Sequence, residues 1–105
     1  MKRIQVILTL DMENLPSNFP DILKEEQAIV AAWKSEGFLE HLFLRDTKNG
    51  AILIFKDKEE AEVKTLMENL PFMKIKKSVE YFNLIQQFFS SLEDEGFKII
   101  ILQRC

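Results

Sequence analysis

Residues 38–55, FLEHLFLRDTKNGAILIF, decide the fold of this chain. Two apolar runs, 38–46 and 51–55, flank Lys48-Asn49-Gly50, and Asn-Gly accepts positive φ at both central positions of a tight hairpin turn. We therefore predict a β-hairpin whose strands are these two runs. Alternation places apolar side chains on both faces of the first strand, with Phe38, Leu42 and Leu44 on one and Leu39, His41 and Phe43 on the other.

The sequence before the hairpin predicts a strand and a helix. Residues 2–10 alternate along the chain as a strand does. Residues 11–20 contain asparagines and prolines and are predicted to form a loop. A helix is predicted from Asp21 to Glu36, where Gly37 suits the left-handed conformation that ends many helices.

The sequence after the hairpin predicts a second helix and a fourth strand. Asp57 and Glu60 resemble a capping box for a helix that runs to Asn69 and is stopped by Pro71. A strand is predicted at 73–82. The resulting order, βαββαβ, is that of the ferredoxin-like fold, so we predict one α+β domain with an antiparallel sheet over residues 1–84.

Residues 85–105 are predicted to add a C-terminal extension. Helical spacing of apolar residues continues to Leu92, Gly96 suits a helix cap, and residues 97–102 form an apolar strand candidate. This helix and strand would pack on the same domain or on a dimer partner.

Apolar side chains on both faces of the hairpin predict that both faces of the sheet are covered. The open face of a lone ferredoxin-like sheet is normally polar, because water covers it. A second copy of the chain, sheet against sheet, would cover the apolar face in a homodimer or a higher homo-oligomer. The alternative cover is the C-terminal helix, and we favour the homodimer.

Composition narrows the class of protein. The chain has 105 residues, 47% of them apolar, and a net charge of −3, which argues against a nucleic-acid partner. No apolar run reaches the length of a membrane span, so no membrane association is expected. The single cysteine, Cys105, cannot form an intramolecular disulfide, and this favours a cytoplasmic protein.

Glu26 is the first candidate catalytic residue. On the predicted helix it falls inside the apolar arc, between Trp33 and Val30. A carboxyl group in apolar surroundings has a raised pKa, which suits a general base or acid near neutral pH. Glu26 could equally lean out to solvent, pair with a lysine or interact with the helix dipole.

The hairpin and the first helix carry the other candidates. His41, the only histidine, is either a proton carrier or an interface histidine with one hydrogen bond. Arg45 either holds a substrate carboxylate or is a solvated strand end. Trp33 and Phe43 are candidates for substrate contact, with packing as the alternative for Trp33. The sequence has neither the ligand spacing of a metal site nor a glycine-rich phosphate loop, so no metal or cofactor is expected.

Three short segments follow one another along the chain: Asn14-Leu15-Pro16 before the predicted helix, His41-Leu42-Phe43 on the next strand and Leu70-Pro71-Phe72 after the second helix. Together these motifs resemble muconolactone isomerase and its relatives in the dimeric α/β-barrel group. Glu26 lies on a helix that ends at Gly37, and the resemblance covers roughly residues 3–84. Leu44 stands where relatives often have arginine, and Arg45 follows it.

The resemblance implies a dimer that binds a small molecule and needs neither metal nor organic cofactor. It implies isomerase chemistry, in which a proton moves on a small unsaturated lactone or related carbonyl compound. Glu26 would be the base, and His41 would donate a hydrogen bond to the carbonyl oxygen. The alternatives are a non-catalytic ligand-binding or assembly module of the same fold and a cofactor-free monooxygenase.

Overall fold

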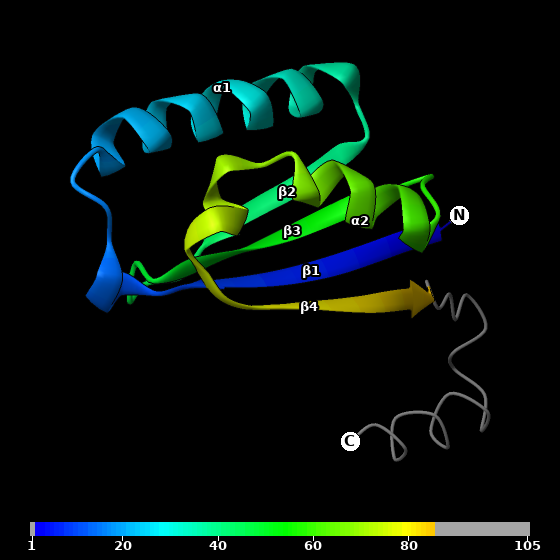
Figure 1. The fold of residues 1–105 in the computed structure, drawn as a ribbon. Coiled ribbons are helices and arrows are strands. Elements are labelled where there is room, and N and C mark those ends of the chain that lie inside the picture. Colours follow the sequence, from blue (N-terminus) through cyan, green and yellow to red (C-terminus); the bar gives the residue numbers. More distant parts are fainter. Residues whose placement is uncertain (1, 86–105) are drawn as a thin grey trace, which may run out of the picture.

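The computed structural model describes residues 2–85, and Figure 1 shows their arrangement. The strands and helices follow the predicted order βαββαβ along the chain, and two short 3-10 helices lie between some of them. The elements are β1 (Lys2–Leu10), η1 (Met12–Asn14), α1 (Phe19–Glu36), β2 (Leu39–Leu44), β3 (Gly50–Lys56), α2 (Glu60–Glu68), η2 (Pro71–Ile75) and β4 (Lys76–Ile85).

The four strands form one antiparallel sheet in the order β2-β3-β1-β4. Both helices lie on the same face of this sheet (Figure 1), which we call the helix face. We call the opposite side the open face. The arrangement confirms the predicted α+β ferredoxin-like fold. The predicted C-terminal helix and strand lie outside the described residues, apart from the start that falls in β4.

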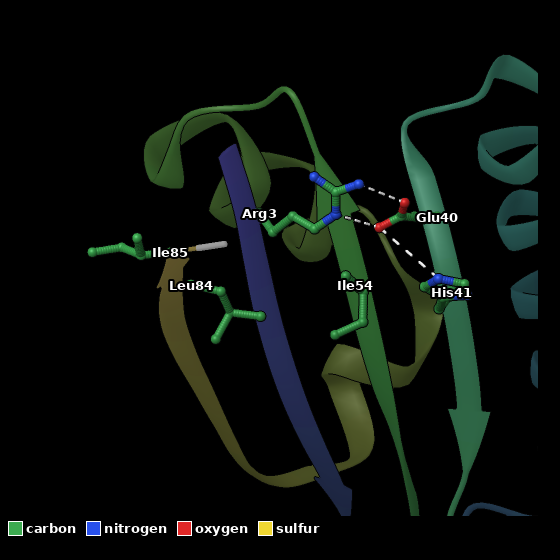
Figure 2. Close-up of a pocket in the computed structure, with 6 residues that line it drawn as sticks. All are labelled: Arg3, Glu40, His41, Ile54, Leu84 and Ile85. Carbon is green, nitrogen blue, oxygen red and sulfur yellow. Dashed lines mark hydrogen bonds and ion pairs between the residues drawn. The ribbon is translucent and has the colours of Figure 1, made fainter. Parts of the chain in front are cut away.

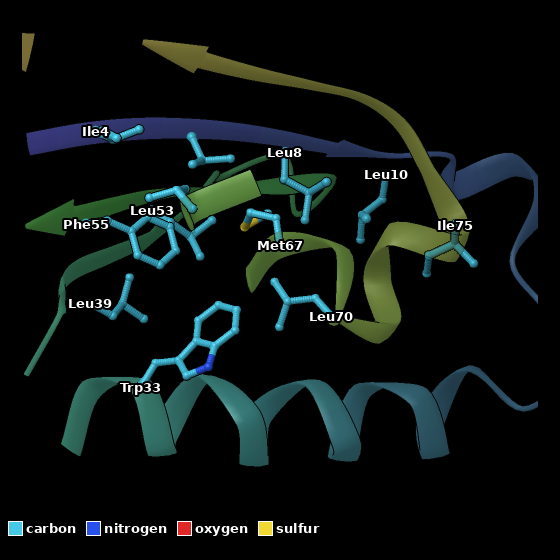
Figure 3. Close-up of a cluster of buried hydrophobic side chains, with 12 residues drawn as sticks. Ile4, Leu8, Leu10, Trp33, Leu39, Leu53, Phe55, Met67, Leu70 and Ile75 are labelled. Atoms are coloured by element: carbon cyan, nitrogen blue, oxygen red, sulfur yellow. The ribbon is translucent and has the colours of Figure 1, made fainter. Parts of the chain in front are cut away.

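The hydrophobic core lies between the helix face and the two helices (Figure 3). The rings of Trp33, Phe38 and Phe55 form its aromatic end, with centroids 5.7 to 6.3 Å apart. Burial of each large side chain contributes about 1.5–3 kcal/mol to stability. Alternate residues of β1 complete the core on the side of the sheet: Ile4, Val6, Leu8 and Leu10.

The predicted alternation along β2 is wrong at one point. The register of β2 against β3 shifts between Leu39 and His41, where Leu39 pairs with Phe55 and His41 with Ile54. Such a bulge adds one residue to one strand and reverses which face the following residues occupy. Leu39 is therefore buried on the helix face, whereas His41 lies on the open face together with Glu40.

The turn between β2 and β3 also differs from the prediction. Lys48 has the positive φ, 62°, while Gly50 is the first residue of β3 and has no positive φ. The loop is longer than a two-residue turn, since the Arg45 N–H donates to the Gly50 carbonyl and the Lys48 N–H to the Arg45 carbonyl. Gly50 is needed for a different reason: a Cβ atom there would lie 2.2 Å from the carbonyl oxygen of Leu8.

Three predicted boundaries are also wrong. Helix α1 begins at Phe19 rather than Asp21, because a proline is tolerated in the first helical turn. The capping box of α2 is made by Glu59 and Glu62, since Asp57, at φ 58°, lies before the helix. Strand β4 begins at Lys76 rather than residue 73, because the preceding residues continue as the 3-10 helix η2.

Candidate functional site

Glu26 lies between α1 and η2, facing the core. Only 7% of its surface is exposed, and it and Trp33 are the two buried residues of α1. The backbone N–H of Phe72 donates a hydrogen bond to Glu26 Oε1 at 3.0 Å, and the Phe72 ring stacks on that of Phe19 at 5.9 Å. Glu26 Oε2 accepts no hydrogen bond from the described residues. One carboxylate oxygen is therefore anchored, and the other has no hydrogen-bond partner among residues 2–85.

Burial raises the pKa of Glu26 to about 7, although the hydrogen bond from Phe72 acts in the opposite direction. Removal of the carboxylate from water disfavours its charged form, and a single N–H donor compensates only in part. Both the proton-accepting and the proton-donating form are therefore populated near neutral pH. This is the condition under which one carboxyl group can take a proton and return it.

The raised pKa of Glu26 makes the stability of the protein depend on pH. Between about pH 4.5, the ordinary value, and about 7 the folded state holds a proton that the unfolded state releases. We expect the free energy of unfolding to fall as pH rises through this window, by up to about 1.4 kcal/mol per unit. Urea denaturation at a series of pH values measures this slope.

A matched pair of variants isolates the contribution of Glu26 to this slope. Glu26→Gln removes the titrating group, so its stability between pH 4.5 and 7 is expected to be nearly flat. Glu25→Gln, at the exposed neighbouring position, should keep the wild-type slope. The ion-paired Glu40 and Glu60 have lowered pKa values, so their contributions are lost only below this window. An unchanged slope in Glu26→Gln would contradict the assignment.

The apolar stripe of α1 around Glu26 is only partly covered. Most of the helix is exposed, and the aliphatic side chains beside Glu26 are half-buried rather than buried: Ile22, Leu23, Ile29 and Val30. A helix whose apolar stripe is incompletely packed leaves apolar surface in contact with water. Part of the apolar surface beside Glu26 is therefore in contact with water.

A second cluster of chemically active side chains lies on the open face (Figure 2). A shallow hollow of about 490 Å³ is lined there by Arg3, Glu40, His41, Ile54, Leu84 and Ile85. Arg3 donates from Nε and Nη2 to the two oxygens of Glu40, at 2.6 and 2.7 Å. This two-point ion pair holds the pKa of Glu40 below its usual value. His41 Nε2 lies 4.0 Å from Glu40 Oε1.

The sequence-predicted site residues are divided between the two faces. Glu26 and Trp33 lie on the helix face, and Trp33 packs in the core. His41 and Phe43 stack on each other on the open face, with ring centroids 5.8 Å apart. Within one chain, the structure does not bring His41 and Glu26 together, because the sheet lies between them.

Arg45 lies at the other end of the open face from the hollow. Its Nη1 donates a hydrogen bond to Thr9 Oγ1 at 3.0 Å. Thr9 lies six residues along β1 from Arg3, which corresponds to about 20 Å of strand. Arg45 therefore ties the loop after β2 to β1 and takes no part in the His41 cluster.

Sequence reasoning missed Arg3 and Glu40. On a regular strand, adjacent residues such as Glu40 and His41 would point to opposite faces. The bulge in β2 places both residues on one face, and no local sequence pattern predicts this bulge. Arg3 meets Glu40 across the intervening strand β3, a contact that depends on strand order.

Two further properties bear on the kind of site. Within residues 2–85, no three histidine, cysteine, aspartate or glutamate side chains are grouped as metal ligands. None of the described helices is long and apolar enough to cross a membrane.

Comparisons with known proteins support the fold. No protein-family model matches the sequence, and no curated protein matches it. Among solved structures, the chain is similar to 5-chloro-2-hydroxyhydroquinone dehydrochlorinase (TftG) from Burkholderia phenoliruptrix AC1100, in complex with 2,5-dihydroxybenzoquinone. The likeness has a TM-score of 0.54 at 18% identity and covers 80% of this chain and 95% of that one. At this identity the similarity concerns the fold.

Proposed function

We propose that this protein catalyses proton transfer on a small, largely apolar carbonyl compound, such as an unsaturated lactone, with Glu26 as the base. The observation that carries the proposal is a buried carboxyl group with a pKa of about 7 and one oxygen without a hydrogen bond from the described residues. Buried carboxyl groups without a charged partner are costly, and they are enriched at sites that need them.

The proposed reaction moves a double bond. Glu26 Oε2 removes a proton from the carbon next to the conjugated carbonyl system, leaving a delocalised enolate. The protonated Glu26 then returns a proton to the other end of this system, which completes the isomerisation. The Phe72 N–H holds Oε1 throughout, so that the same carboxyl group faces the substrate in both steps.

Two findings support this choice of chemistry. The similar structure is named as a dehydrochlorinase, and loss of hydrogen chloride also requires removal of a proton from the substrate. The aromatic and aliphatic side chains around Glu26 suit an apolar ring. The proposal keeps Glu26 as the base and gives His41 no contact with this substrate, since His41 lies on the open face of the sheet.

Turnover of muconolactone in deuterated water tests this function. We expect a change in ultraviolet absorbance as the double bond moves, and deuterium at the new C–H position, because the carboxyl proton exchanges with solvent between the two steps. A folded protein that neither converts nor labels muconolactone or related unsaturated lactones would contradict the proposal.

We also propose that two copies associate through their open faces. Phe43 is 56% exposed there, and Phe82 and Leu84 are also uncovered. An exposed apolar sheet face is normally buried in an assembly. Sedimentation should show a dimer that Phe43→Glu weakens by at least about tenfold, since it places a charge in an apolar interface. A wild-type monomer at all concentrations would contradict this assembly.

A further inference from the structure

The hollow on the open face is a site distinct from Glu26, and its polar groups select a particular kind of ligand. Arg3 Nε and one N–H of Nη2 donate to Glu40. The third nitrogen of the guanidinium, Nη1, is fully enclosed and has no partner among the described residues. Arg3 is therefore committed chiefly to Glu40, whose carboxylate would lie beside any anion that enters the hollow (Figure 2).

His41 makes no hydrogen bond with the described residues, so its ring nitrogens remain available to a ligand. A neutral imidazole carries one N–H and one nitrogen with a free lone pair. Glu40 Oε1 lies 4.0 Å from His41 Nε2, beyond hydrogen-bond distance. A neutral His41 therefore has one ring nitrogen that can accept a hydrogen bond, and its side chain is 55% exposed and so open to a ligand.

The rest of the hollow is apolar. Ile54 from β3 and Leu84 from β4 form its floor, on either side of β1. Ile85 continues the apolar surface at the edge of the sheet. The ring of Phe43, two residues along β2, stacks on the imidazole of His41. A flat apolar ring would remove this surface from water at a gain of about 25 cal/mol for each Å² buried.

We propose that this hollow binds a small apolar ring that carries a hydroxyl group. The hydroxyl donates a hydrogen bond to His41, and the ring lies on Ile54 and Leu84. Glu40 lies beside the imidazole, and Arg3 holds Glu40 in place through the two-point ion pair. Association of two open faces would enclose this hollow and keep water from the hydrogen bond.

Three naphthalene probes that differ in one substituent test the proposal on the full chain. 2-Naphthol has the hydroxyl donor, 2-methoxynaphthalene has the same ring without the donor, and 2-naphthoate replaces the hydroxyl with a carboxylate. His41 is the only histidine, so its ring signals in NMR spectra report binding without ambiguity. We expect 2-naphthol to shift these signals saturably and to bind about tenfold more tightly than either other probe.

Variants identify the groups responsible, with naphthol fluorescence as the readout. His41→Phe keeps an aromatic ring but removes the acceptor, so the preference for 2-naphthol over its methyl ether should disappear. Leu84→Asn should weaken the binding of 2-naphthol and of its methyl ether by a similar factor, because it removes part of the apolar floor of the hollow. Glu68→Gln, at an exposed position of α2 on the helix face, is the control and should bind as the wild type does.

Several results would overturn this inference. Tighter binding of 2-naphthoate would make the hollow an anion site, and equal binding of the ether would make it a purely apolar one. Absence of any shift at His41 in the folded wild-type protein would exclude the site, including the case in which a second copy fills it. Because the readout is binding at His41, it is independent of turnover at Glu26.

Discussion

Glu26→Gln is expected to lower turnover of the lactone by about 10²–10⁴-fold, with little change in KM. Glutamine keeps the size of the side chain, and its amide oxygen can still accept the hydrogen bond from the Phe72 N–H. The packing between α1 and η2 is therefore preserved, while the group that accepts the proton is lost. Steady-state rates followed by ultraviolet absorbance measure the effect.

Two controls separate this chemical effect from a loss of structure. Glu25→Gln makes the same change one residue earlier, at an exposed position, and should retain wild-type turnover. The urea midpoint of Glu26→Gln at pH 5 should be close to that of the wild type, because Glu26 is mostly neutral there in the folded state. Full activity in Glu26→Gln would exclude Glu26 as the base and would favour a non-catalytic role.

Gly50→Ala is expected to destabilise the protein by about 3 kcal/mol or more, a large part of the 5–15 kcal/mol typical of a domain. The new Cβ atom would lie 2.2 Å from the Leu8 carbonyl oxygen and 3.2 Å from Thr9 Cα. Both contacts are with backbone in β1, so no side chain can rotate to relieve them. The start of β3 must separate from β1, which breaks the pairing of Gly50 with Thr9 between the two central strands of the sheet.

Gly37→Ala is the matched control for this substitution. Gly37 has a φ of 95°, so alanine is strained there, but its Cβ atom would meet nothing within 4 Å. A cost of about 1 kcal/mol is expected, from the left-handed backbone alone. Urea denaturation should rank Gly50→Ala well below Gly37→Ala in stability. Equal losses would show that the contact with Leu8 is relieved by a small shift.

The pattern of side chains in the sequence predicts only part of the candidate site. The burial of Glu26 followed from its place in the apolar arc of α1, because a helix of 3.6 residues per turn fixes which residues share a face. The proximity of Arg3 to Glu40 could not follow in this way. It depends on the order of strands in the sheet and on one extra residue in β2.

The sequence by itself determined the order of strands and helices along the chain, the ferredoxin-like class and the apolar character of both sheet faces. These properties depend on local periodicity, which a single chain segment carries in full. The tertiary structure alone decided that Glu26 and His41 occupy opposite faces, that η2 supplies the donor to Glu26, and that Gly50 serves strand contact rather than a turn. Each of these depends on segments distant in sequence, and a bulge of one residue reverses every side chain beyond it.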